Sequence, residues 1–203
     1  MPYHNNYIGV LEVFDNRPEK NDIRFELIYS EDGYNWERPF RNCDYIDRNT
    51  TNKWDWGVQF IASILEDDQD IKIYYGGMNA VMDEKSMAEC QSFGVGVAKV
   101  EKDMFCGLKT LSHKKGSILF KPFYVEKSIH IKVKVETEGY LIYQLKDVKG
   151  NIVKGFSFDE CIKITRNEKN YLLRWNNTNQ LKSGEYIIEI EAFNACLYSV
   201  DIG

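Results

Sequence analysis

Short apolar runs with strand-like alternation, separated by turns rich in Gly, Asn and Asp, recur along the whole chain of 203 residues. Alternation of apolar and polar residues is typical of half-buried β-strands, and Gly, Asn and Asp mark the turns that join them. In the first half of the chain we expect strands at residues 7–14, 23–30, 35–40, 57–65, 71–76 and 93–100, with a weaker strand at 104–108. The pattern therefore predicts an all-β protein.

The predicted strands of the first half fall into two similar groups. Each group opens with an apolar strand and closes with a weaker one, and the groups are roughly 45 residues apart, which is the spacing of blades in a β-propeller. Residues 78–91, between the strands expected at 71–76 and 93–100, are polar. We expect them to form a loop with a short helical turn. Residues 1–106 are thus interpreted as about two blades of an incomplete propeller.

A second all-β region follows. We interpret residues 107–115 as a linker and residues 116–203 as an antiparallel β-sandwich domain. Its expected strands lie at 118–123, 128–136, 139–147, 152–156, 171–175, 186–193 and 197–202. This number of short strands in so short a stretch is typical of a sandwich.

The segment Ser30–Pro39 carries the clearest local signal in the chain. Asp32-Gly33 predicts a hairpin turn because glycine adopts a positive φ without a Cβ penalty. Trp36 can fold back over that turn, and Pro39 ends the pairing of the strand. Turns of this kind recur in β-propeller blades of carbohydrate-active proteins, although a hairpin with a buried Trp is equally a purely structural feature.

Composition and charge exclude some classes of partner. Aromatic residues make up 14% of the chain, which suits both the filling of β cores and the stacking of sugars. The net charge is −5, and basic residues are not clustered with aromatic ones, so we expect no nucleic-acid partner. Residues 1–105 carry 11 Lys/Arg against 20 Asp/Glu, whereas residues 106–203 carry 15 against 11. This asymmetry indicates two units with different surfaces.

The five cysteines are scattered and form no C-x-x-C pair. They predict neither a disulfide framework nor a zinc site, and the acidic run at 66–70 does not match a calcium loop. We therefore expect no metal and no cofactor. The first residues lack the features of a signal peptide, and no apolar run is long enough to span a bilayer, so the expected location is cytoplasmic, without a membrane.

Four stretches, in this order along the chain, carry a resemblance to a known family. They are Ser30–Pro39; Ile73-Tyr74-Tyr75-Gly76-Gly77; Gly94-Val95-Gly96-Val97-Ala98 with Asp103-Met104-Phe105; and, in the last region, Gly155-Phe156-Ser157, Cys161, Trp175 and Ala195-Cys196-Leu197-Tyr198-Ser199. Together they resemble the C-terminal half of five-bladed β-propeller proteins of the glycoside hydrolase 32/43-like superfamily. The resemblance implies a propeller followed by a sandwich.

The same resemblance implies that the catalytic carboxylates are missing. In this family the nucleophile and the acid/base carboxylate stand on early blades, and no matching segment occurs in this chain. We therefore assign no catalytic residue.

One short motif is a candidate sugar subsite. Trp54, Asp55 and Trp56 stand where an inner strand of the second group begins, and they offer an aromatic platform with a carboxylate that accepts hydrogen bonds from hydroxyl groups. A purely structural alternative is that both Trp side chains fill space between blades while Asp55 caps a turn. His4, at the start of the first group, is a further candidate because it can face the central axis of the propeller.

Two functions remain open at this point. One is a carbohydrate-active protein of the glycoside hydrolase 32/43-like type, here a C-terminal portion that is inactive alone. The other is a non-catalytic carbohydrate-binding or assembly module. In both cases two blades leave an apolar face that other blades normally cover, so we expect homo-oligomers or a partner chain that supplies the missing blades.

Overall fold

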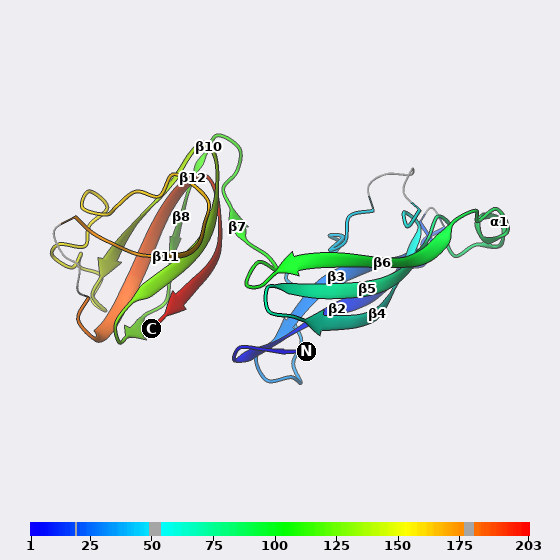
Figure 1. Ribbon diagram of the computed structural model, residues 1–203, viewed down its shortest axis with the longest axis horizontal. Helices are drawn as coiled ribbons and strands as arrows, with labels where there is room; N and C mark the ends of the chain where they lie inside the picture. Colours follow the sequence, from blue (N-terminus) through cyan, green and yellow to red (C-terminus); the bar gives the residue numbers. More distant parts are fainter. Residues whose placement is uncertain (19, 49–53, 177–180) are drawn as a thin grey trace. The chain divides into compact units, whose positions relative to one another are not determined.

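The structure, a computed structural model, describes residues 1–18, 20–48, 54–176 and 181–203 (Figure 1). The described residues form β-strands and one short helix, which confirms the predicted all-β class. The chain divides into two compact units, Met1–Lys102 and Asp103–Gly203.

The first unit is built on a single sheet of six strands. In order across the sheet they are β1 (Pro2–Tyr3), β2 (Asn6–Asp15), β3 (Asp22–Ser30), β4 (Val58–Glu66), β5 (Asp70–Met78) and β6 (Phe93–Glu101). Strands β1–β3 and β4–β6 are two antiparallel groups, and one parallel pair, Ile23 with Val58, joins them. Ile23–Val58 is the only pair in the ladder between these groups among the described residues, and the N–H of Ile61 in β4 also donates to the Glu12 carboxylate in β2.

The expected strand at 35–40 does not form. Only Glu37 pairs with a strand, through an isolated bridge to Tyr29. The reason lies in the preceding turn, where the Asp32 carboxylate accepts hydrogen bonds from the backbone N–H groups of Tyr34 and Asn35 and holds them out of a ladder. Trp36 does fold back, because its indole N–H donates to the carbonyl of Gly33, but its side chain stays 42% exposed.

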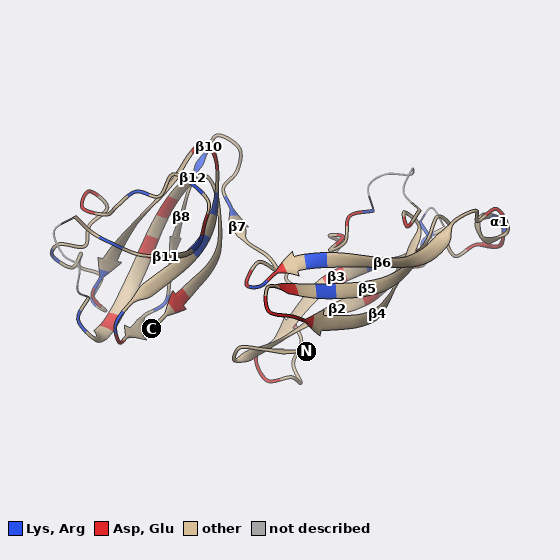
Figure 2. Cartoon of the chain, viewed as in Figure 1, with Lys and Arg blue, Asp and Glu red and all other residues tan. Residues whose placement is uncertain are grey.

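Polar residues shape the ends of the sheet. Helix α1 (Glu84–Ala88) lies in the loop at 78–91, where we expected a short helical turn. The Asp83 side chain caps this helix by accepting a hydrogen bond from the N–H of Ser86. The acidic turn between β4 and β5 is paired with lysines, Asp67 with Lys72 and Glu66 with Lys102 (Figure 2). These carboxylates are therefore neutralised locally.

The second unit contains antiparallel strands β7 (Leu108–Lys109), β8 (Lys115–Leu119), β9 (Phe123–Val125), β10 (Ile129–Lys146), β11 (Glu168–Leu172) and β12 (Gly184–Ile202). The order is β11-β10-β12-β7, and β8 and β9 also pair with β12. Because Leu108 of β7 pairs with Leu197, and Lys115 already belongs to β8, residues 107–115 are part of this unit and not a free linker.

Two pairs of expected short strands are single long strands in the structure. Strand β10 covers both 128–136 and 139–147, and β12 covers both 186–193 and 197–202. The β10–β12 ladder is interrupted between Val135 and Tyr140, and the strands continue beyond the interruption.

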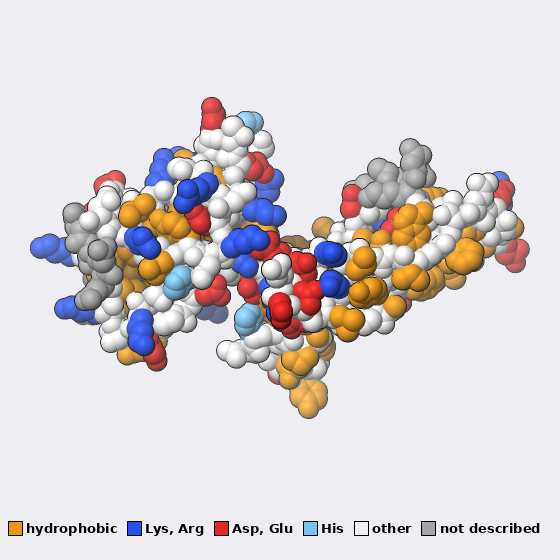
Figure 3. Space-filling view, viewed as in Figure 1, with side chains coloured by type: hydrophobic (Ala, Val, Ile, Leu, Met, Phe, Trp, Pro, Cys, Tyr) orange, Lys and Arg blue, Asp and Glu red, His pale blue; other side chains and the backbone are white. Residues whose placement is uncertain are grey.

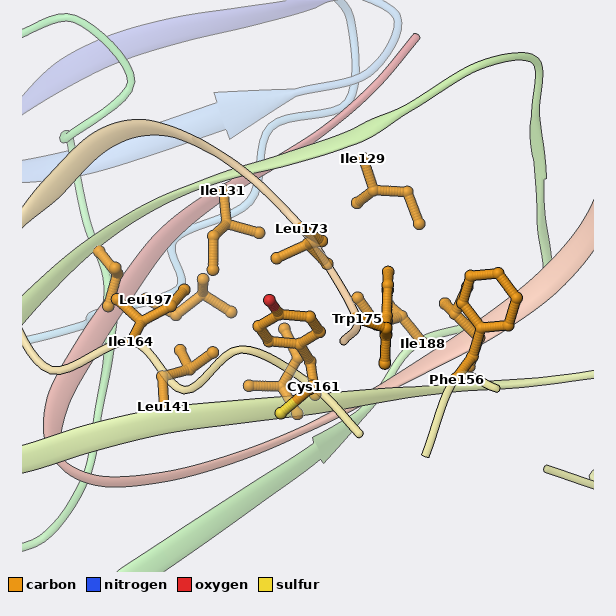
Figure 4. Packing of buried hydrophobic residues seen from close by; sticks show 14 of the residues in the cluster. Ile129, Ile131, Leu141, Phe156, Cys161, Ile164, Leu173, Trp175, Ile188 and Leu197 are labelled. Atoms are coloured by element: carbon orange, nitrogen blue, oxygen red, sulfur yellow. The ribbon is translucent and has the colours of Figure 1, made fainter. Parts of the chain in front are cut away.

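One apolar core fills the second unit. It includes Ile129, Ile131, Leu141, Tyr143, Phe156, Cys161, Trp175, Ile188 and Leu197 (Figure 4). Trp175 is its largest aromatic member, and its ring meets the rings of Tyr143 and Phe156 edge-on, each at a centroid distance of 4.9 Å. Cys161 lies in this core, and all five cysteines of the chain are free.

Candidate functional site

A large cavity with a polar lining lies in the first unit, where β2 ends and β3 begins. It has a volume of about 830 Å³. We call it the β3 cleft, and its lining consists of Arg17, Pro18, Lys20, Asp22, Arg24, Asn42, Asp44, Asp47, Arg48, Trp56, Val81 and Asp83. The wall thus combines carboxylates, guanidinium groups, an amide and one indole ring.

The alternation of β3 places the polar side chains of the cleft. Successive residues of a strand point to opposite faces, so Asp22, Arg24 and Glu26 share one face of β3, while Ile23 and Phe25 share the other. Both faces are covered, since Phe25 is 0% and Arg24 only 5% exposed. The segment 37–48 contributes the residues that meet the polar face.

Glu26 is the buried anchor of this arrangement. Its carboxylate is fully buried and accepts two hydrogen bonds from Arg38, at 2.9 and 2.7 Å, one of 2.9 Å from the N–H of Asn42, and one of 3.3 Å from Arg24. Burial alone opposes ionisation, but these donors outweigh it and lower the pKa of Glu26. Glu26 therefore stays ionised and orders the segment that carries Arg38 and Asn42.

Asp15 holds the other end of Arg24. Its carboxylate accepts a 2.7 Å hydrogen bond from Nε of Arg17 and a 3.3 Å hydrogen bond from Arg24. The hydrogen bonds from Arg17 hold the pKa of Asp15 well below its usual range, against the effect of burial. Arg24 is thus clamped between two carboxylates, Asp15 and Glu26, and its position in the wall is fixed.

Arg48 joins the two strand groups at the cleft. It pairs with Asp44 at 3.1 Å and with Asp22 at 3.1 Å, and it donates a 2.8 Å hydrogen bond to the carbonyl of Gly57. Asp22 belongs to β3, whereas Gly57 directly precedes β4. One guanidinium group therefore links both halves of the sheet where the cleft opens.

Two polar atoms of the cleft residues have unused hydrogen-bonding capacity. Nε of Arg24 and Oδ1 of Asp22 are buried and have no hydrogen-bond partner among the residues that the structure describes. Buried polar groups are nearly always satisfied, so such exceptions indicate either strain or a missing partner. One is a donor and the other an acceptor, and both are covered by the surrounding side chains.

The structure separates the three residues of the predicted Trp54-Asp55-Trp56 platform. Trp56 lines the β3 cleft. Asp55 is only 4% exposed, and its carboxylate accepts a 2.6 Å hydrogen bond from the hydroxyl of Tyr75. The ring of Trp54 is stacked on that of Tyr75, with a centroid distance of 6.0 Å and an interplanar angle of 15°. Asp55 and Trp54 thus hold the start of β4 in place, and only Trp56 is available to a ligand in the cleft.

His4 lies far from the cleft. It occupies the exposed turn between β1 and β2, with its ring edge-on to that of Tyr3. The register pairs Tyr7 with Ser30 at this end of β2 and Asp15 with Asp22 at the other. At about 3.3 Å per residue, the two ends of β2 are roughly 30 Å apart. His4 is therefore not a cleft residue.

Sequence reasoning missed Asp22, Arg24, Asn42 and Arg48. A signal for the first two exists, since charged and apolar residues alternate strictly in Asp22-Ile23-Arg24-Phe25-Glu26. A strand with ionisable residues on one face and large apolar residues on the other predicts a polar site when both faces are covered. No local signal identifies the residues of the segment 37–48.

Comparisons with known proteins add no assignment: no family model, no curated protein and no solved structure matches this chain. Among the described residues, no cluster of His, Cys, Asp and Glu side chains is suited to bind a metal ion, and no helix is long and apolar enough to cross a membrane.

Proposed function

We propose that the chain is a carbohydrate-binding protein of the glycoside hydrolase 32/43-like type, and that it holds a saccharide in the β3 cleft. The observation that carries this proposal is the wall of the cleft, where Asp22, Arg24 and Arg48 stand in fixed positions beside the indole ring of Trp56. Sugar hydroxyls both donate and accept hydrogen bonds, and their C–H faces pack on aromatic rings. The cleft volume of about 830 Å³ lies in the range of small-molecule sites.

The two buried carboxylates that hold Arg24 in the wall of the cleft are not suited to act as the acid of a glycoside hydrolase. Glycoside hydrolysis needs a carboxylic acid whose pKa is raised, so that it can protonate the leaving group. Asp15 and Glu26 show the opposite, because neighbouring arginines lower the pKa of both. This agrees with the family resemblance, which implies that the catalytic carboxylates belong to blades that this chain does not contain.

The experiment that tests the proposal is a saccharide screen on the purified chain. A glycan array selects candidate sugars, and isothermal titration calorimetry measures their affinity. We expect saturable binding of at least one saccharide at one site in the first unit, without release of reducing ends during long incubation. Absence of saturable binding to every sugar would refute the proposal, and turnover of a glycoside would refute its non-catalytic part.

The edge of the first sheet favours an assembly module as a second candidate function. The two edges of this sheet are β1, which has only two residues, and β6, which has nine. Among the described strands, β6 pairs with β5 alone. Phe93, Val95 and Val97 of β6 are 84%, 79% and 47% exposed and share one face. Figure 3 shows apolar side chains along this sheet. An open edge with an apolar face is a template for another strand.

We infer that a second copy of the chain pairs with this edge. If two β6 strands pair antiparallel about Val95, Phe93 of one copy lies opposite Val97 of the other, so the apolar residues meet on one face of a continuous sheet. Multi-angle light scattering at micromolar concentration tests this directly. We expect the mass of a dimer, and a strictly monomeric chain at all accessible concentrations would exclude the arrangement.

A further inference from the structure

The second unit contains a partly open cavity that the proposed function does not use. It has a volume of about 330 Å³ and lies among the start of β10, the segment 172–175 and Phe156. Ile129, Phe156, Leu173 and Trp175 give it an apolar interior, and Lys127 and Arg174 also line it. Figure 4 shows Trp175 beside Phe156, with Leu173 and Ile129 close by. Its size is at the lower end of the range for small-molecule sites.

Trp175 has an unmet hydrogen-bonding need in the wall of this cavity. Its side chain is only 3% exposed, and its ring is held edge-on by Tyr143 and Phe156. The indole N–H is buried and has no acceptor among the described residues. A buried Trp normally finds an acceptor for this group, since leaving it unpaired costs free energy. Trp175 is therefore a rigid part of the cavity wall, while its N–H is covered by the surrounding residues.

Two cations that line the same cavity have no ion-pair partner among the residues that the structure describes. Lys127 and Arg174 are exposed residues. Neither side chain forms an ion pair or a hydrogen bond with a described residue. Other cations of the unit are paired, such as Lys115 with Glu191 and Lys146 with Glu189. An apolar cavity with unpaired cations at its wall favours an anion that also has an apolar part.

We propose that this cavity binds a small carboxylate with a flat apolar body. The body packs against Ile129, Phe156 and Leu173. The carboxylate supplies the negative charge that Lys127 and Arg174 attract. This site is separate from the β3 cleft, so the proposal goes beyond the saccharide binding proposed for the first unit.

The test is an NMR titration of the full chain with naphthalene-2-carboxylate. The chain has four Trp, so we expect four indole N–H signals in an amide correlation spectrum. We expect one signal, the one assigned to Trp175, to shift with saturation. Assignment comes from triple-resonance spectra, and the variant Trp175→Phe is only a check, because this residue belongs to the core. The neutral probe naphthalene-2-methanol should bind at least tenfold more weakly.

Charge variants complete the test. The double variant Lys127→Gln/Arg174→Gln should lower the affinity for the carboxylate at least tenfold. The matched double variant Lys149→Gln/Lys154→Gln, at exposed positions of the same unit, should leave it unchanged. Failure of the Trp175 signal to shift, or equal affinity for the acid and the alcohol, would overturn the proposal. Saccharide binding in the β3 cleft should be identical in both double variants, so the two proposals can fail independently.

Discussion

The hydroxyl of Tyr75 donates a 2.6 Å hydrogen bond to the buried carboxylate of Asp55. Burial, and then this hydrogen bond, raise the pKa of Tyr75, so the hydroxyl keeps its proton. The ring of Tyr75 also stacks on Trp54 and lies edge-on to Phe25. One pair of side chains thus fixes the chain that leads into β4, and it explains why Asp55 serves the fold while its neighbour Trp56 lines the cleft.

Loss of the Asp55 carboxylate should destabilise the first unit. Asp55→Ala leaves the Tyr75 hydroxyl buried without an acceptor, which typically costs about 1–3 kcal/mol. Amide hydrogen exchange of β5 measures the local free energy of opening. Tyr74→Phe, which removes a hydroxyl from the opposite face of the same strand, is the control and should change it little. Equal protection in both variants would show that the Tyr75–Asp55 pair contributes nothing.

Substitution of Trp56 should weaken saccharide binding, since Trp56→Ala removes the aromatic face of the β3 cleft. Loss of a stacked ring should lower affinity by about tenfold or more, on the order of 1.4 kcal/mol. Trp36→Ala is the matched control, because Trp36 follows the opposite end of β3. Calorimetry on both variants measures the difference. If Trp36→Ala proves the more damaging of the two, the saccharide site is elsewhere.

The stability of the first unit should fall at acidic pH because of Glu26. Its pKa in the folded chain lies below the ordinary 4.5, so its contribution is complete above about 4.5 and is lost as the pH falls through the folded value. Glu26→Gln should be less stable than the wild type at pH 7 by about 3–5 kcal/mol, as for other broken buried pairs. Urea unfolding at pH 7 and at a pH below 4.5 should show that the difference in the free energy of unfolding between the two proteins becomes smaller in acid. Glu31→Gln, at an exposed site, should show no such change.

Gly57 should tolerate no side chain. A Cβ at this position would lie 2.1 Å from the carbonyl oxygen of Ala80, whereas a Cβ at Gly76 would have no heavy atom nearer than 3.9 Å. Gly57→Ala must therefore displace the chain after β5, together with the Gly57 carbonyl that Arg48 binds. We expect loss of saccharide binding and a lower melting temperature for Gly57→Ala, and a near-normal chain for Gly76→Ala. Differential scanning calorimetry and titration distinguish the two.

A charge on the open edge should abolish self-association. Val95→Lys places two ammonium groups against each other at the centre of the proposed β6–β6 pairing, where like charges are unfavourable. Light scattering should then report a monomer. Val148→Lys, at another exposed valine in the second unit, serves as the control and should keep the mass of the wild type. Dimers that survive the change at Val95 would require a different interface.

Apolar alternation predicted most of the strands, and local turn chemistry explains the missing strand at 35–40 and the long strands β10 and β12. The strands expected at 104–108 and 152–156 do not form, apart from Leu108 in β7 and an isolated bridge at Ile152. The expected ends of β2 to β6 lie within two residues of the observed ones. The breaks expected within β10 and β12 are irregularities in one ladder, because Glu138 and Asn194 adopt positive φ values of 59° and 44° at facing positions and the strands then resume. A turn residue in the sequence does not reveal whether the chain reverses or continues.

The candidate site was predictable only in part. Trp56 was singled out from the sequence, and the structure places it in the β3 cleft. Its neighbours in the cleft come from elsewhere, since Asn42 and Arg48 reach the polar face of β3 through an irregular segment. The position of such a segment depends on buried ion pairs such as that of Glu26 with Arg38, which no local pattern encodes.

Strand β12 pairs with β7, β8, β9 and β10, and it is the last strand in the sequence. During synthesis, β7, β8, β9 and β10 therefore cannot complete their pairing with β12 until residue 202 has left the ribosome. Pairing across such long sequence separations is slow, because the loop-closure entropy is lost before the contacts form. The nascent second unit should thus depend on chaperones until its final twenty residues emerge, whereas β1–β6 can assemble earlier.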